Sequence, residues 1–155
     1  MLWLNQLLRI EMILQDVLYI SYHVPIEVVR PLVPEALPLS VVGGDNTFIS
    51  VVILKCRHVH ATYFPFPRLH YEQINIRTYV KDPQTGQQAV YFIRSAVTSP
   101  VVSALTSTMG LSWEPAVFHL DVPDFPDNWP SAYSAGGNWQ GNWFLKADNF
   151  ISLPS

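Results

Sequence analysis

The chain has 155 residues, of which 49% are hydrophobic and only 14% charged, and its formal net charge is −3. This composition is too apolar for a disordered chain and too poor in charge for a helical bundle held by ion pairs. No cluster of Lys and Arg is present, which excludes the counterion release that drives nucleic-acid binding. We expect a single domain over residues 1–155, with a hydrophobic core of its own.

Residues 1–14 are apolar but interrupted by polar side chains such as Arg9 and Glu11. A membrane span needs about 20 apolar residues, and a signal peptide needs a charged start and a small-residue cleavage site. Neither pattern is present, so we predict a short amphipathic helix here and no membrane partner. Cys56 is the only cysteine and cannot form an internal disulfide, which fits a reducing compartment and a cytoplasmic protein.

The first strand is predicted at residues 16–23, where Tyr19, Ser21 and His23 share one face by their alternation. Pro25 suits the first position of a helix, and residues 26–32 supply one or two helical turns before further prolines end it.

A turn at residues 43–46, rich in Gly and Asp, separates segments 39–42 and 47–57, which we predict to pair as a hairpin. The second of these segments is almost continuously apolar, as is typical of a strand that is buried on both faces. Residues 58–69 contain two prolines and are predicted to be an irregular connection.

A second hairpin is predicted from strands 72–81 and 88–97, which flank a five-residue turn at 82–86. Ser99 then has the character of an N-cap, Pro100 of a first helical position and Gly110 of the residue after a C-cap. The predicted helix carries one apolar stripe, formed by Val101, Leu105 and Met109.

The C-terminal region contains one further predicted strand at 116–120 and another at 142–147. The tail from residue 121 onward is rich in Pro, Gly and Trp, and we predict it to be partly loop. The elements together favour a mainly β protein with a few short helices.

Several local strings resemble the YqjF-like family of uncharacterised proteins, in the acetoacetate-decarboxylase-like superfamily. They comprise Tyr22-His23-Val24-Pro25, Arg30-Pro31-Leu32-Val33-Pro34-Glu35, Asn75-Ile76-Arg77-Thr78-Tyr79-Val80, Val90-Tyr91-Phe92 and Met109-Gly110-Leu111. The resemblance covers residues 14–120 and leaves the tail, 121–155, unmatched. It implies an antiparallel β-barrel with an internal cavity, which we expect to be incomplete at its C-terminal end because family members usually run longer.

The best candidate binding site lies on strand 72–81, where alternation puts Gln73, Asn75, Arg77 and Tyr79 on one face. If that face lines a cavity, Arg77 can hold a carboxylate or phosphate through its planar guanidinium. The alternative is a solvated arginine, or one paired with Glu72.

The partner strand, 88–97, adds Tyr91 as a candidate hydrogen-bond donor to the ligand, although a buried tyrosine more often serves packing. Arg94 either faces the cavity as a second guanidinium or lies on the surface as a solvated charge.

Acetoacetate decarboxylase forms a Schiff base through a lysine that follows a helix, and the resemblance allows that position to be inspected. The comparable stretch, residues 110–115, contains no lysine. Lys55, within an apolar strand, is the only substitute, and Glu72 resembles the decarboxylase's cavity glutamate. We therefore do not expect Schiff-base chemistry, and no cofactor is implied.

Three histidines, His58, His60 and His70, could supply three nitrogen ligands to a metal, but they lie in a proline-rich segment without evident acidic residues to orient their rings. We predict no metal site. His23 and Cys56 are interpreted as structural residues.

Three functional hypotheses remain. The first is a cavity that binds a small anionic organic molecule, with Glu72, Asn75, Arg77, Tyr79 and Tyr91 as ligand-binding residues and no catalytic residue assigned. The second is a lyase or isomerase acting on a small keto or hydroxy acid without a Schiff base. The third is a structural or partner-binding domain whose tryptophan-rich tail forms an interface. We also expect a homodimer in which this tail covers an open edge of the barrel.

Overall fold

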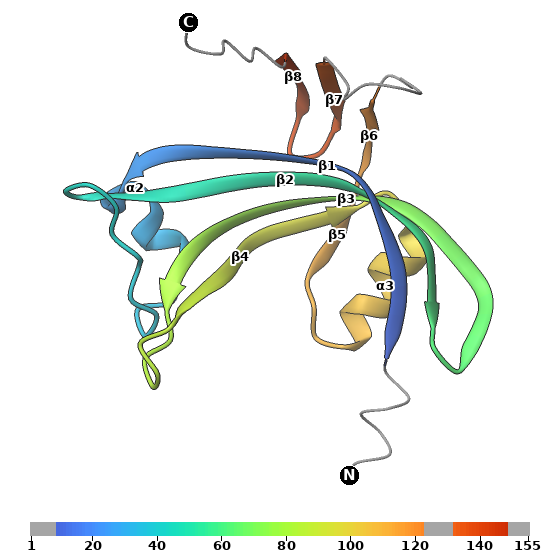
Figure 1. Ribbon diagram of the computed structural model, residues 1–155, viewed down its shortest axis with the longest axis horizontal. Coiled ribbons are helices and arrows are strands. Elements are labelled where there is room, and N and C mark those ends of the chain that lie inside the picture. The colour runs from blue at the N-terminus through green and yellow to red at the C-terminus, as the bar shows by residue number, and fades with distance from the viewer. Residues whose placement is uncertain (1–8, 123–131, 149–155) are drawn as a thin grey trace, which may run out of the picture.

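The computed structural model describes residues 9–122 and 132–148, and they form two β-sheets with three short helical segments (Figure 1). The elements in chain order are β1 (Ile10–Pro25), α2 (Ile26–Val29), the 3-10 turn η1 (Arg30–Leu32), β2 (Asn46–Ala61), β3 (Phe64–Lys81), β4 (Gln88–Val97), α3 (Pro100–Thr108), β5 (Trp113–Pro115), β6 (Val117–Asp121), β7 (Ala132–Asn138) and β8 (Asn142–Asp148).

The larger sheet has the order β1-β2-β3-β4-β5, with antiparallel neighbours except for the parallel pair β4–β5. The second sheet, β6-β7-β8, is antiparallel. The strand predicted at 88–97 coincides with β4, and the turn predicted at 82–86 connects it to β3. A mainly β fold with few short helices is therefore confirmed. In the described part of the chain the two sheets do not close into a barrel.

The larger sheet is covered on both faces, which explains why β2 is nearly continuously apolar. One face carries Leu18, Ile53 and Ile74, which pack against Phe118 and Leu120 of the second sheet. In Figure 1 the long strands β1–β4 form an arch, with β6–β8 above it and α3 below. We call the side toward β6–β8 the intersheet face.

The opposite face of the larger sheet is here called the polar face, because Gln73, Asn75, Arg77 and Tyr79 lie on it by strand alternation. At one end α3 covers this face, and Val102 packs there with Val52, Leu54 and Val97.

The predicted caps of α3 are confirmed. Ser99 Oγ accepts a hydrogen bond from the Val102 amide at 3.4 Å, and Gly110 follows the C-cap with a φ of 79°. The predicted apolar stripe is wrong, however, because Val101, Leu105 and Met109 are all at least half exposed. The buried residues of the helix are instead Val102 and Ser103.

Three expectations about local structure are wrong. Residues 10–14 belong to β1 and not to a helix, because they pair with the end of β2. The rest of the expected helix, residues 1–8, lies outside the described residues. Segment 39–42 contacts β2 through one backbone hydrogen bond, from Val42 N to Asn46 O at 2.8 Å, and otherwise lies against β3: Ser40 N donates to Tyr79 O at 2.9 Å, and Leu39 bridges Val80.

The segment 58–69 is not an irregular connection, since β2 and β3 continue through it as a long hairpin. The pairing tolerates the irregular sequence through register shifts on both sides of Val59. His58 has a positive φ of 52° next to one of these bulges.

The short strand predicted at 116–120 is confirmed as β6, and the one at 142–147 as β8. The sequence did not reveal β5 or β7. Trp139 is 9% exposed and belongs to the core between the sheets, and Trp143 packs against that core. Trp139 is therefore a core residue and not the interface residue that we expected, and Trp143 is partly buried against the same core. Trp129 lies outside the described residues. No helix in the described part of the chain is long and apolar enough to cross a membrane.

Candidate functional site

Strand register assembles a row of polar side chains on the polar face, across three strands. Ser21 of β1 lies opposite Ser50 of β2, and Ser50 lies opposite Arg77 of β3. Tyr19 lies two residues before Ser21 on β1 and therefore on the same face. Residues separated by up to 58 positions in sequence are thereby brought into one cluster.

The hydroxyl groups of this row form a connected network. Ser21 Oγ and Ser50 Oγ are 2.8 Å apart, and Ser50 Oγ is 3.3 Å from the Tyr79 hydroxyl. The Tyr79 hydroxyl also forms a short hydrogen bond with the Tyr19 hydroxyl. Because each hydroxyl can donate or accept, the network can adjust its polarity to a bound molecule.

Arg77 lies against the Tyr19 ring, with its guanidinium carbon 4.8 Å from the ring centroid. Its Nε is buried and has no hydrogen-bond partner among the described residues. None of the ion pairs found among these residues involves Arg77. The alternative, an ion pair with Glu72, is not formed, because odd and even positions of β3 face opposite ways.

Two buried amides continue the row toward α3. Asn75 is 5% exposed and Gln73 is 9% exposed. Gln73 Nε2 donates to Asn75 Oδ1 at 2.9 Å. This contact orients both amides, so Asn75 is a supporting residue within the row.

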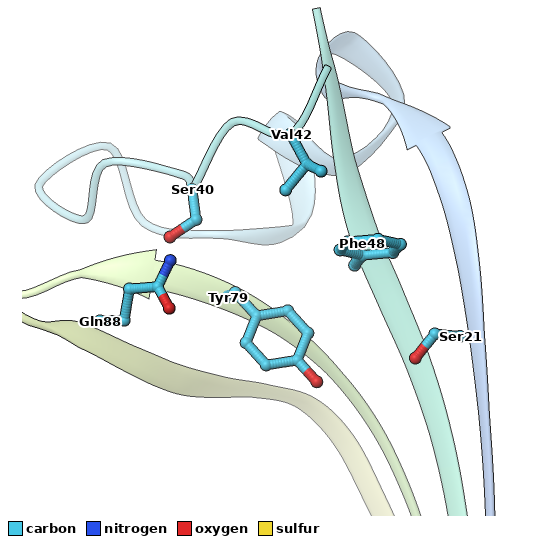
Figure 2. Close-up of a pocket in the computed structure, with 6 residues that line it drawn as sticks. All are labelled: Ser21, Ser40, Val42, Phe48, Tyr79 and Gln88. Atoms are coloured by element: carbon cyan, nitrogen blue, oxygen red, sulfur yellow. The ribbon is translucent and has the colours of Figure 1, made fainter.

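A pocket of about 300 Å³ opens beside the hydroxyl network, where the segment around Ser40 replaces β2 as the neighbour of β3. Figure 2 shows Tyr79 projecting between Phe48 and Ser21 on one side and Ser40 and Gln88 on the other. The Ser40 hydroxyl is buried and has no hydrogen-bond partner among the described residues. Its volume places this pocket at the lower end of the range for small-molecule sites.

The electrostatics of the row favour an ionisable tyrosine. The interaction with the Ser50 hydroxyl lowers the pKa of Tyr19 from the ordinary value of 10.0, and Arg77 acts in the same direction through a hydrogen bond and its charge. Partial burial acts against these effects. The environment of Tyr19 therefore favours release of its proton.

The structure does not bring the other two predicted site residues, Glu72 and Tyr91, to this row. Tyr91 pairs with Thr78, on the other face, and packs against Val29 and its neighbours. Glu72 also points to the intersheet face, where its Oε2 accepts a hydrogen bond from Leu120 N at 2.9 Å. Desolvation raises the pKa of Glu72. Its observed role is to join β3 to β6.

The candidate nucleophile Lys55 has a protein partner. Its Nζ lies 3.0 Å from Asp16 Oδ2, and Asp16 occupies a bulge of β1 with a positive φ of 51°. A lysine held by a carboxylate lacks the desolvated or cation-flanked environment that activates Schiff-base lysines. The stretch 110–115 contains β5, with Trp113 and Glu114, and no lysine.

The three histidines do not converge as metal ligands. His58 and His70 stack edge to face at 4.9 Å, whereas His60 Nδ1 contacts the His58 carbonyl at 2.7 Å. No group of three or more His, Cys, Asp or Glu side chains suited to a metal exists within the described residues. Burial raises the pKa of the Cys56 thiol, as befits an unreactive core residue.

Sequence reasoning missed Tyr19, Ser21 and Ser50 as members of the site. The alternation of β1 already placed Tyr19 and Ser21 on one face, but Ser50 lies within an apolar run. Their proximity to Arg77 depends on the register of three strands, which the sequence pattern left open.

Solved structures with the same fold include acetoacetate-decarboxylase-like enzymes. The enduracididine biosynthesis enzyme MppR complexed with pyruvate has a TM-score of 0.65 and 14% identity, over 90% of this chain and 57% of that one. MppR with HEPES buffer bound has a TM-score of 0.64 and 15% identity, over 90% and 55%. An acetoacetate decarboxylase-like enzyme from Sphingomonas wittichii RW1 has a TM-score of 0.60 and 10% identity, over 81% and 51%.

This chain thus spans little more than half the length of these proteins, and at such identities the likeness shows the fold alone. Among curated proteins no match was found. Residues 11–134 match the family DUF2071, described as "Uncharacterized conserved protein (COG2071)". The match confirms the resemblance expected from the Asn75-to-Val80 string and its companions, and it includes the whole polar row. The chain therefore belongs to the DUF2071 family of uncharacterised conserved proteins.

Proposed function

We propose that the polar face binds a small anionic organic molecule through Arg77. The observation that supports this most is the environment of the guanidinium. It is partly buried, its Nε is unpaired among the described residues, and none of their carboxylates forms an ion pair with it. A partly desolvated arginine without a carboxylate is costly, and a bound anion removes that cost.

The hydroxyls next to Arg77 suit the same ligand. Tyr19 and Tyr79 supply neutral donors beside the cation, and the pocket that Tyr79 lines has room for a molecule of a few heavy atoms. MppR, which shares the fold, is described in complex with pyruvate, a small carboxylate. We therefore place small carboxylic acids first among the candidate ligands.

The alternative is a lyase or isomerase that acts on a small keto or hydroxy acid without a Schiff base. The lowered pKa of Tyr19 favours this reading, because a tyrosine that releases its proton more readily can exchange protons with a bound acid. In this scheme Arg77 holds the carboxylate, and Tyr19 and Tyr79 carry the proton. Tyr91, on the other face, has no part in it.

We also propose a homodimer and a cytoplasmic location. The dimer is supported by β1, which has a neighbour on one side only in the described sheet and exposes several apolar side chains. The cytoplasmic location is supported by the single buried cysteine, Cys56, since the fold needs no disulfide.

The anchor role of Arg77 is tested by titrating pyruvate into the protein by calorimetry. Arg77→Met should weaken binding about tenfold or more, because a charge-assisted hydrogen bond contributes about 1.5–3 kcal/mol. It should leave the melting temperature unchanged or raise it, since it removes a poorly compensated charge. Arg68→Met is the matched control, because Arg68 lies over the exposed Phe66 ring, away from the row.

Equal affinity in the parent protein and Arg77→Met would refute the anchor. Native mass spectrometry of the purified protein complements the titration, since a retained acid would identify the natural ligand. Turnover of that acid by the parent protein, and its loss in Tyr19→Phe with binding kept, would favour the enzymatic alternative.

A further inference from the structure

A second cavity lies between the two sheets, on the side of β3 opposite to Arg77. Its volume is about 400 Å³, within the range of small-molecule sites. One wall consists of branched aliphatic side chains of β2 and β3, among them Ile74 and Ile76. The other wall is aromatic and consists of Trp139, Trp143 and Phe144. A cavity with aliphatic and aromatic walls favours a ligand with an apolar part that fills it.

The same cavity has a charged group fixed beside it. Arg94 and Gln140 line it, and both contact the carboxylate of Glu114. Glu114 Oε2 accepts hydrogen bonds from Trp139 Nε1 at 2.8 Å and from Gln140 Nε2 at 3.0 Å. Glu114 Oε1 lies 3.4 Å from Arg94 Nε. Glu114 is thus held in place by the aromatic wall and in turn positions Arg94.

The contact with Glu114 uses the Nε edge of Arg94. Among the described residues, no hydrogen bond or ion pair is found at its two terminal nitrogens, and its side chain is 47% exposed. A guanidinium that is oriented through Nε presents its terminal nitrogens as a fork for a carboxylate. Arg94 thus gives the otherwise apolar cavity a cationic group at which a carboxylate can bind.

A buried donor in the aromatic wall also lacks a partner. Trp143 Nε1 is buried and forms no hydrogen bond with any residue that the structure describes. Buried indole N–H groups usually find an acceptor, and an unpaired one is unfavourable. An oxygen atom on a molecule within the cavity would satisfy it.

We propose that the intersheet cavity is a second binding site, for an amphipathic carboxylic acid whose apolar body, aromatic or aliphatic, lies between the tryptophans and the isoleucines and whose carboxylate meets Arg94. This site is independent of the proposed function at Arg77, because the two arginines belong to opposite faces of the larger sheet. The two sites also differ in the body of the acid that they accept, since the pocket at Tyr79 is smaller and lies beside a hydroxyl network.

The test uses 4-phenylbutyrate and its uncharged counterpart 4-phenyl-1-butanol as probes. Binding is followed by calorimetry and by intrinsic tryptophan fluorescence, to which Trp139 and Trp143 in the cavity wall contribute. We expect the acid to bind about tenfold more tightly than the alcohol, and Arg94→Met to remove this difference while leaving alcohol binding unchanged. Arg77→Met should affect neither probe, which separates this site from the one on the polar face.

Circular dichroism and melting curves establish that each variant is folded, and Arg94→Lys provides a second variant that keeps the charge but loses the fork. Arg94→Lys should retain only part of the preference for the acid. The proposal is wrong if neither probe binds, if acid and alcohol bind equally, or if Arg77→Met and not Arg94→Met removes acid binding.

Discussion

Tyr19 and Arg77 illustrate how a single side-chain pair sets the chemistry of the polar face. The Tyr19 hydroxyl contacts Tyr79, while the Tyr19 ring lies under the guanidinium. The neighbouring Ser50 and Arg77 both stabilise the phenolate, which lowers the pKa of Tyr19. Deprotonation of Tyr19 should therefore begin at a lower pH than deprotonation of an isolated tyrosine.

An absorbance titration of the phenolate band should accordingly reveal a tyrosine that ionises below the ordinary value of 10.0. The sign follows from the charges: Arg77→Met removes a cation that favours the phenolate, so the transition should move to higher pH. Tyr19→Phe should abolish the transition, whereas Tyr22→Phe, on the other side of β1, should keep it. Persistence of the transition in Tyr19→Phe would assign it to another residue.

At the residue scale the sequence predicted part of the site. Strand alternation placed Asn75, Arg77 and Tyr79 on one face, and the structure has them there because β3 is regular over this stretch. The same alternation places Glu72 on the opposite face from Arg77, and the structure shows no pairing between them. Strand alternation did not identify Ser50, which lies within an apolar run. Its neighbours, Ser21 and Arg77, follow only from the register of β2 against β1 and β3.

At the scale of elements, the β6–β7 pair depends on a close approach of the two backbones at Gly137. A Cβ atom on Gly137 would lie far inside contact distance of the Phe118 Cα and the Val117 carbonyl oxygen. Gly137→Ala should therefore separate β6 from β7 and destabilise the protein by about 1–3 kcal/mol or more. Urea denaturation followed by circular dichroism measures this loss.

Gly136→Ala is the matched control, one residue away in the same strand. Its Cβ would approach Phe144 Cδ2 at 3.1 Å and the Trp143 carbonyl oxygen at 3.3 Å, which are tight contacts but far longer than those that a Cβ on Gly137 would make. The control should therefore cost much less than Gly137→Ala. If both variants lose a similar free energy of unfolding, the close contact of Gly137 with Phe118 is not what makes glycine necessary in β7.

Element prediction succeeded where local signals were strong. The turn before β4 and the Ser99 cap of α3 are specified by turn-forming and capping residues within the segment itself, so their positions follow from the sequence. The partner of segment 39–42 was predicted wrongly because an apolar segment can pair with any neighbouring strand. Backbone groups of β3 that β2 does not pair form hydrogen bonds with this segment. Residues 10–14 failed because pairing with the far end of β2 overrides their helical pattern.

At the scale of the whole molecule, β1 is the exposed element. It lies at the edge of the larger sheet, and its side chains Ile13, Leu14 and Val17 are 56%, 55% and 47% exposed. A long edge strand with apolar side chains is a site for pairing with another chain. We expect light scattering to show a dimer that is formed through β1.

Two lysines on this strand test the interface. The double replacement Ile13→Lys with Val17→Lys should convert the dimer to a monomer, because charges on an edge strand oppose edge-to-edge pairing. Val28→Lys, on α2 and equally exposed, should leave the dimer intact. A parent protein that is monomeric at high concentration would contradict the prediction.

The sequence by itself determined the class of fold, the family and the polar strand at its centre. Each of these depends on local information: strand alternation, turn and cap residues, and short strings such as the one from Asn75 to Val80. The tertiary structure alone decided what these elements meet. It assigned Tyr19 and Ser50 to Arg77, moved Glu72 and Tyr91 to the other face, and placed Trp139 with Glu114 beside a second cavity. The physical reason is that strand register and sheet packing are set by the sum of many weak, long-range contacts, and no single segment encodes them.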